Sequence, residues 1–155
     1  MNNAKLVFIH SEYVPLLKEL PADATGKWGK MNPQQMVEHV TDFFKVSGKK
    51  ISIALVTPVD QLPQYKEFLL SDKEFRENTK APGNIVPEEP GPVQKPSMHE
   101  ALEELQSEIN DFVKCFEKDP QLKVLHPVFG ELSFDEWVLL HHKHITHHLR
   151  QFGLL

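Results

Sequence analysis

Seven of the twelve prolines in this chain fall between residues 51 and 96. Proline lacks a backbone N–H and interrupts helices and central strands, so this segment cannot form one regular element. The whole chain has 155 residues, which is enough for a single domain with its own core. We therefore expect one domain over residues 1–155, with regular elements on both sides of residues 51–96. Within that segment, residues 62–71 are expected to form a short helix, and the rest reads as an extended loop.

Four segments outside the proline-rich region carry helix signals. Three of them open with Asn or Ser followed three positions later by Gln or Glu, which is the pattern of a capping box. The first lacks that pattern, and its Pro15 would be tolerated only in a first helical turn. Residues before Ser11 form either a short helical turn or a docked arm. The expected helices are residues 11–20, 32 to about 48, 97 to just before 119, and 133 to nearly 153.

The third of these segments has the clearest amphipathic pattern. Its apolar residues recur at steps of three and four, which is typical of a helix that packs in a bundle. No stretch of the chain alternates with period two, so a sheet protein is not expected. The sequence predicts an all-α fold, a four-helix bundle in which residues 51–96 form a long crossover between helices two and three. The apolar stripe consists of Leu102, Leu105, Ile109, Phe112 and Phe116.

Charge and hydropathy exclude several classes of protein. The net charge of -5 provides no basic surface for nucleic acid. The apolar runs are far shorter than the roughly 20 residues of a membrane span, and the first residues lack the apolar core of a secretory signal. The single cysteine, Cys115, excludes an intrachain disulfide framework and is expected to be a buried structural thiol. We expect a cytoplasmic protein without a membrane partner.

Histidines are concentrated in the last predicted helix. The chain has nine, and five of them lie between residues 141 and 148. At 100° per residue, three of these five share the apolar stripe that must face the core. A buried imidazole is costly unless its nitrogens have partners, so several on one stripe need a common explanation. The three on the stripe are His141, His144 and His148, whereas His142 lies off it and His147 lies at its edge.

The spacing of two of these histidines indicates a metal site. His144 and His148 are separated by four residues, which stacks their side chains on one helix face. Two imidazoles make a weak site, and His39 is the candidate third ligand because it lies on the inward face of the second helix. Three histidines with open positions are typical of catalytic metal sites, and the ion would be Zn, Ni, Cu or Fe(II). The alternatives are core histidines without metal, or a solvated polar face.

Several neighbours complete the candidate site. Three roles are possible for His141. It is a fourth ligand, a group beside the ligands or in the pocket wall, or a plain core residue, and we favour the second of these. Gln151 follows His148 by one turn and is expected to hold a ligand imidazole through its free nitrogen. Asp42 and Glu38 are candidate bases, although each is more readily explained as an orienting or solvated acid. His126 is a candidate for the mouth of the site, although a turn residue is the favoured interpretation. Residues 78–83 are expected to border the pocket.

Two motifs resemble the DinB/YfiT-like superfamily. Residues 28–39, WGKMNPQQMVEH, are similar to its first metal-ligand segment, and residues 144–153, HITHHLRQFG, resemble its last-helix motif H-x-x-H-H-x-x-Q. The wider pattern, from HPVFG at residues 126–130 through Trp137 to the C-terminal RQFG, is similar to a subfamily of unassigned function. The resemblance extends over almost the whole chain in helix order.

This resemblance implies a four-helix bundle with a crossover between helices two and three. It also implies a divalent metal, nickel or zinc, held by His39, His144 and His148, and frequent homodimers. Characterised relatives include thiol-dependent transferases and a mycothiol-dependent isomerase, but activity does not transfer with fold. The expected function is therefore a metal-dependent enzyme, either a transferase that uses a low-molecular-weight thiol or a hydrolase, acting on a small molecule. The alternative is a non-enzymatic bundle with a structural or sensing metal.

Overall fold

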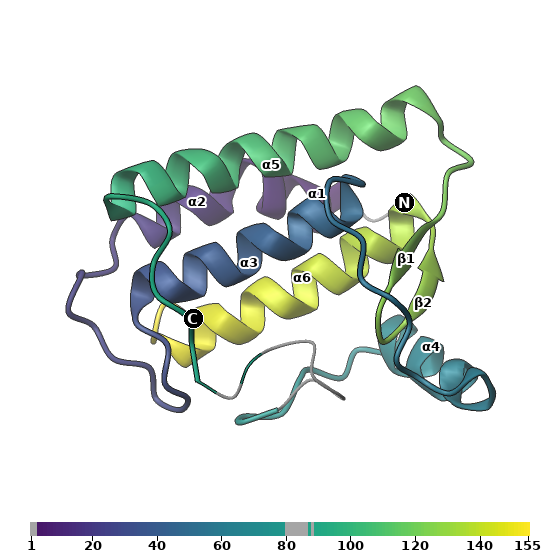
Figure 1. Cartoon of the computed structure of the whole chain (residues 1–155), viewed down its shortest axis with the longest axis horizontal. Coiled ribbons are helices and arrows are strands. Elements are labelled where there is room, and N and C mark those ends of the chain that lie inside the picture. Colours follow the sequence, from purple (N-terminus) through teal and green to yellow (C-terminus); the bar gives the residue numbers. More distant parts are fainter. Residues whose placement is uncertain (1–2, 80–86, 88) are drawn as a thin grey trace.

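The structure is a computed structural model that describes residues 3–79, 87 and 89–155. It is mostly helical, as the sequence predicts, and one two-stranded antiparallel sheet is the exception (Figure 1). None of the helices in the described ranges is long and apolar enough to cross a membrane. The elements are α1 (Asn3–Val7), α2 (Tyr13–Leu17), α3 (Pro33–Ser47), α4 (Leu62–Leu70), α5 (Met98–Lys118), β1 (Val124–His126), β2 (Gly130–Leu132) and α6 (Phe134–Gln151).

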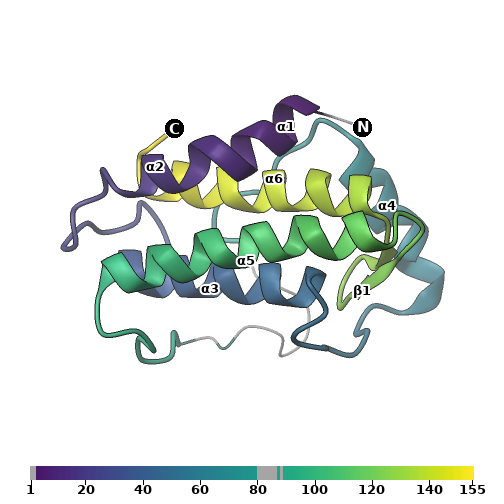
Figure 2. The same cartoon turned by 90° about the horizontal axis from the view of Figure 1, so that it is seen from above.

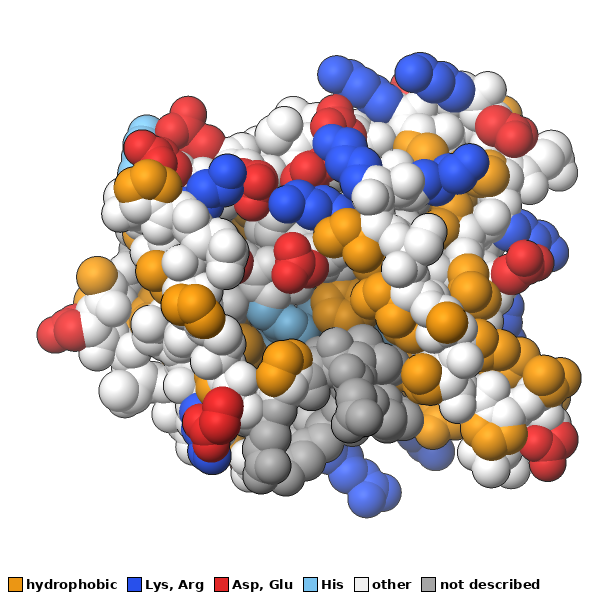
Figure 3. Space-filling model, in the orientation of Figure 1, with side chains coloured by type: hydrophobic (Ala, Val, Ile, Leu, Met, Phe, Trp, Pro, Cys, Tyr) orange, Lys and Arg blue, Asp and Glu red, His pale blue; other side chains and the backbone are white. Residues whose placement is uncertain are grey.

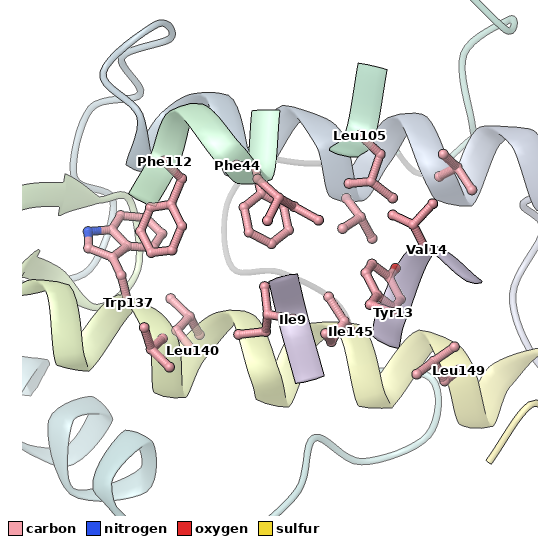
Figure 4. Close-up of a cluster of buried hydrophobic side chains, with 14 of the residues drawn as sticks. Ile9, Tyr13, Val14, Phe44, Leu105, Phe112, Trp137, Leu140, Ile145 and Leu149 are labelled. Carbon is pink, nitrogen blue, oxygen red and sulfur yellow. The ribbon is translucent and has the colours of Figure 1, made fainter. Parts of the chain in front are cut away.

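The long helices run alongside one another with the N-terminal segment. Figures 1 and 2 show α3, α5, α6 and the pair α1–α2 lying side by side, and contacts join α3 to α5 and α6, α1 to α6, and α2 to α5. The predicted apolar stripe of α5 is buried in full. Side chains from all of these helices meet in one core (Figure 4). The fully buried members include Ile9, Tyr13, Phe44, Leu105, Phe112, Trp137 and Ile145.

Local capping explains why three helices begin where the sequence predicts. Asn32 and Ser133 both form complete capping boxes, with Gln35 and Glu136 respectively. Ser97 accepts a hydrogen bond from the Glu100 N–H, and the described contacts do not include the reciprocal bond that a capping box would add. Each cap satisfies backbone N–H groups that have no partner within the helix.

The N-terminal helix differs from its prediction. Helical structure begins at Asn3 and α2 ends at Leu17, instead of extending over residues 11–20. Residues 3–10 are therefore helical rather than a docked arm. Pro15 is the third residue of α2, but helical structure continues before α2, so the proline lies inside a longer helical segment. A π-helical turn, Phe8–Glu12, connects α1 to α2 just before this proline. The wider turn accommodates the missing N–H and the proline ring, which would otherwise disrupt an α-helix.

The described residues between α3 and α5 pass over the outside of the helices. The N–H of Val56 donates to the Pro127 carbonyl at 2.8 Å, and the Thr57 hydroxyl donates to the Val128 carbonyl at 2.7 Å. Farther along, α4 lies in the predicted short-helix region and contacts α6. The Lys143 ammonium donates to the Ser71 carbonyl at 2.7 Å. These contacts tie the crossover to the hairpin formed by β1 and β2 and to α6.

Candidate metal centre

Three histidines from two helices meet at one point. His39 belongs to α3, whereas His144 and His148 lie one turn apart on α6. The Nε2 atom of His144 is 3.0 Å from Nε2 of His39 and 3.1 Å from Nε2 of His148. One possible ligand atom from each of the three lies within 4.8 Å of the others. Nitrogens that share one ion at 2.0–2.1 Å lie about 3–3.4 Å apart, so the two short distances suit a common ion.

Hydrogen bonding sets which nitrogen of His148 carries the proton. The Gln151 amide nitrogen donates to the Trp28 carbonyl at 2.9 Å, so its Oε1 is left to face His148. That oxygen lies 2.7 Å from His148 Nδ1, and an amide oxygen can only accept. Nδ1 therefore bears the hydrogen, and Nε2 presents its lone pair toward His144 and His39. This is the tautomer that a metal ligand requires.

The loop before α3 holds Gln151 in this position. The Lys27 N–H donates to the Gln151 carbonyl at 2.7 Å. Gly29 has a positive φ of 78°, and a Cβ atom there would come within 2.8 Å of Gln151 Nε2. Only glycine tolerates both this backbone conformation and this close approach. The segment of residues 26–29 thus orients a glutamine that in turn orients His148.

Burial keeps the three imidazoles neutral. Desolvation, with a smaller contribution from nearby His39, lowers the pKa of His148 to about 3. Desolvation, followed by the influence of His147, lowers the pKa of His39 to about 4. Desolvation is also the main reason that the pKa of His144 lies well below its usual value. At neutral pH all three rings are uncharged, so the chemistry of this donor set fits a divalent cation.

The three histidines line a cleft that is open to solvent. Figure 3 shows histidine surface recessed near the middle of one face, with acidic and basic side chains above it. The crossover supplies part of the wall, including Asn78 and Thr79. The rest of the segment predicted to border the pocket, residues 80–83, lies outside the described residues. The roughly 2130 Å³ of the cleft is ample for a small molecule.

His141 is a core residue that also reaches the cleft wall. Its Nε2 lies 2.9 Å from the Ser47 hydroxyl, which itself donates to the Phe44 carbonyl, so His141 is the donor in this pair. The ring stacks on Phe44 with centroids 3.8 Å apart, and only 1% of the residue is exposed. His141 is not among the residues whose ligand atoms converge. His141 lies in the cleft wall, and the Ser47 contact gives its buried Nε2 a hydrogen-bond partner.

The two candidate acids have different surroundings. Both carboxylate oxygens of Glu38 accept hydrogen bonds from the crossover, from the Gln94 N–H at 2.7 Å and the Lys95 N–H at 3.1 Å. Glu38 is thus an anchor for the crossover. Asp42 is exposed at the cleft one turn after His39, and partial desolvation raises the pKa of its carboxyl group. Asp42 is thus a carboxylate at the cleft surface near the three histidines.

Replacing Glu38 with glutamine is expected to loosen the crossover. Hydrogen bonds to a charged group contribute about 1.5–3 kcal/mol each, so loss of one corresponds to at least tenfold faster local opening. Amide hydrogen exchange at Gln94 and Lys95 measures this opening. Glu19→Gln, at an exposed residue of the first interhelical loop, is the control and should leave both amides unchanged. Unchanged protection in Glu38→Gln would show that the anchor is unimportant.

Some features of the site have no sequence signal, or a weak one. The Trp28 carbonyl orients Gln151 through the backbone, which no side-chain pattern reveals. His147, placed at the edge of the stripe, is buried, and its Nδ1 atom has no hydrogen-bond partner among the described residues. Its ring contacts Trp28 and Phe75 in the cleft wall.

Cys115 was expected to be buried, but it is only half-buried against the core, because it lies beside the α5 stripe rather than on it.

His126 gives the protein a predictable response to acid. Desolvation lowers its pKa to about 3, whereas an unfolded histidine titrates near 6.5. Between pH 6.5 and 3, this histidine binds a proton in the unfolded chain but not in the folded chain. Its contribution to the free energy of unfolding is therefore fully present above pH 6.5 and decreases as the pH falls. His126 alone should lower the free energy of unfolding by about 2 kcal/mol between pH 7.5 and 5. Denaturant titrations of wild type and His126→Asn at both pH values measure this, and equal pH dependence would contradict the assignment.

Comparison with known protein families agrees with this geometry. The model of the DinB superfamily matches residues 6–152. The chain belongs to the DinB superfamily. The matched region of this DinB-superfamily protein includes His39, His144, His148 and Gln151. Neither the curated proteins nor the solved structures contain a significant match to it. The family is metal-associated, and the three histidines could hold an ion here, but neither finding identifies the ion or a reaction.

Proposed function

We propose that this DinB-superfamily protein is a divalent-metal-dependent enzyme that acts on a small molecule. His39, His144 and His148 would hold the ion, which we propose to be nickel or zinc. The observation that carries this proposal is the convergence of three imidazole nitrogens in the wall of an open cleft. Within the described ranges the converging group contains no fourth protein ligand. A set of three ligands beside a cleft is typical of catalytic rather than structural sites.

The chemistry of such a site suits two reactions. A bound divalent ion would lower the pKa of a water or thiol, or polarise a carbonyl. The protein is therefore proposed to be a transferase that uses a low-molecular-weight thiol, or a hydrolase. Gln151 would keep His148 in its ligating tautomer, and Asp42 would accept or return a proton at the cleft surface. The side-by-side helices also support a four-helix bundle. The proposal further includes a homodimer located in the cytoplasm.

Gln151 offers a test of the metal site away from the ligands. Replacing it with leucine removes the acceptor at His148 Nδ1, and loss of such an outer partner typically costs about 10–100-fold in metal affinity. Gln151→Glu is the matched control, because its carboxylate still accepts from Nδ1. We expect zinc affinity to fall in Gln151→Leu and to be better retained in Gln151→Glu, as measured by competition with a chromophoric chelator. Equal affinity in wild type and Gln151→Leu would contradict the role given to this side chain.

The function itself is tested by metal analysis followed by activity assays. The metal content of the purified protein is measured, and nickel or zinc is then restored before thiol-transfer and ester-hydrolysis panels. Turnover should require the ion and disappear in His144→Ala. His142→Ala is the matched control, since His142 lies on the same helix but contacts Phe8 instead of the cluster. Turnover without metal would contradict the proposal. Metal that is needed only for folding, with no activity on any panel, would favour the structural or sensing alternative.

A further inference from the structure

His126 lies at the end of β1 and uses one ring nitrogen to build the hairpin turn. Its Nδ1 accepts hydrogen bonds from the N–H groups of Val128 at 3.0 Å and Phe129 at 3.3 Å. A nitrogen that accepts two hydrogens carries none of its own. The proton of the neutral imidazole is therefore on Nε2, which is a donor.

This Nε2 hydrogen has no protein partner in the described part of the chain. Only 7% of His126 is exposed, and the residue lines the cleft. Nε2 is not fully enclosed, since it is not among the buried side-chain atoms that lack a partner in the described residues. A largely buried donor without a partner is unfavourable unless water or a ligand satisfies it. The unused donor thus points to a ligand position at this end of the cleft.

Aromatic rings pack around the His126 ring. The Phe43 ring stacks on His126 with centroids 5.7 Å apart and 23° between the planes. Phe129 packs edge-on to His126 at 5.2 Å, and Tyr65 packs edge-on to Phe129 at 5.7 Å. All of these side chains line the same cleft. Such surroundings favour a flat apolar molecule, because aromatic rings pair with offset or edge contacts.

The aromatic region adjoins the three histidines. The Phe43 ring lies 5.4 Å from the His39 ring and 5.3 Å from the His144 ring, between centroids. Phe43 therefore contacts both His126 and the candidate metal centre. A molecule that occupies the surface around His126 and Phe43 would extend toward the three converging nitrogens.

We propose that His126 is a substrate-binding residue, which donates from Nε2 to a neutral hydrogen-bond acceptor on a planar aromatic molecule. A neutral acceptor fits better than a carboxylate, because one uncharged donor among aromatic rings does not compensate for desolvating an anion. An aryl carbonyl group has the required chemistry. As the substrate class of the enzyme this rests on the proposed function, but the binding step itself needs no metal.

The test compares two probes of the same shape. Acetophenone carries a carbonyl oxygen, and α-methylstyrene has a CH₂ group in its place. The full chain should bind acetophenone about fivefold more tightly than α-methylstyrene, because a neutral hydrogen bond contributes about that factor to affinity. We expect this preference both without metal and with one equivalent of zinc. Ligand-observed NMR titration gives both affinities. Equal affinities, or no binding of either probe, would overturn the proposal.

Two variants assign the preference to one side chain. His126→Asn keeps an acceptor near the position of Nδ1 for the turn, but its shorter side chain places no donor at the position of Nε2, so it should bind the two probes equally. Tyr65→Phe removes the other polar group of the aromatic region and should retain the preference. A preference that survives in His126→Asn, or disappears in Tyr65→Phe, would overturn the assignment. In wild type the His126 Nε2–H resonance should shift on addition of acetophenone, and this signal decides the question even if His126→Asn does not fold.

The same titration separates this proposal from the proposed function. His148→Ala, which removes a candidate metal ligand, should retain the fivefold preference for acetophenone. If the protein binds no metal but discriminates between the probes, the proposed function fails and His126 remains a binding residue. If the protein binds metal and turns over a substrate but does not discriminate, the role of His126 is wrong.

Discussion

Replacing His148 with alanine is expected to lower the affinity for zinc or nickel by more than about 100-fold, because loss of an outer partner alone already costs about 10–100-fold. His148 is the ligand whose tautomer is fixed by a hydrogen bond, and its Nε2 lies 3.1 Å from that of His144. Removing it leaves two imidazoles, which form a weak site. Competition with a chromophoric chelator measures the affinity.

The control for this variant is His142→Ala, on the same helix but outside the cluster. It should bind metal as wild type does. His148→Ala should also retain its fold, because the core is built from apolar side chains on all of the long helices. Unaltered metal affinity in His148→Ala, with the fold intact, would remove His148 from the site.

Replacing Trp137 with alanine should cause a large loss of stability, about 3–5 kcal/mol. The indole is fully buried, and its Nε1 donates to the Val124 carbonyl at 3.1 Å. It also stacks on His141 and packs beside His126, so it connects α6 to β1 and the cleft wall. The variant would leave a cavity and lose the hydrogen bond between the indole and Val124. Chemical denaturation followed by circular dichroism measures the change.

Trp137→Phe separates these two contributions. It keeps most of the apolar contact but loses the hydrogen bond to Val124, so it should cost less than the alanine variant. If Trp137→Ala changed the free energy of unfolding by less than about 1 kcal/mol, the described packing around the indole would be wrong.

Helix boundaries were predictable where local chemistry decides them. Asn32 and Ser133 satisfy the first backbone N–H groups of α3 and α6, and this signal is complete within four residues of sequence. The bounds of the first helix were predicted wrongly, because the effect of Pro15 is not decided by local chemistry. The proline is compatible with a longer helix because the turn before it is π-helical, and burial of Ile9 stabilises that arrangement. Such compensation depends on packing with distant residues.

The hairpin formed by β1 and β2 could not be predicted from periodicity. Each strand has three residues, which is too short for alternation to stand out. Its position depends on long-range contacts, namely the Trp137 indole and the crossover residues Val56 and Thr57. Neighbouring residues of α3 also have different surroundings. Phe43 lines the cleft, whereas the adjacent Phe44 enters the core, because α3 packs on both α5 and α6.

The candidate site shows the same division. His144 and His148 were predicted to be ligands from their four-residue spacing on one helix face. His39 was predicted to join them because it lies on the inward face of the second helix. The roles of the neighbouring side chains depended on partners that the sequence does not reveal. Glu38 is taken up by backbone N–H groups of the crossover, and His141 by the Ser47 hydroxyl. The Glu38 carboxylate and the His141 imidazole therefore have structural partners.

The most direct test of the metal centre is a zinc titration followed by NMR of the histidine ring nitrogens. The structure predicts saturation at one equivalent, with shifts of the ring nitrogens of His39, His144 and His148. The Nε2 signal of His141 should persist as a protonated nitrogen bonded to Ser47, and the His126 ring should keep its tautomer. Saturation at one equivalent with these three residues affected is the predicted result. No saturation, or coordination by His141 in place of one of the three, would contradict the account.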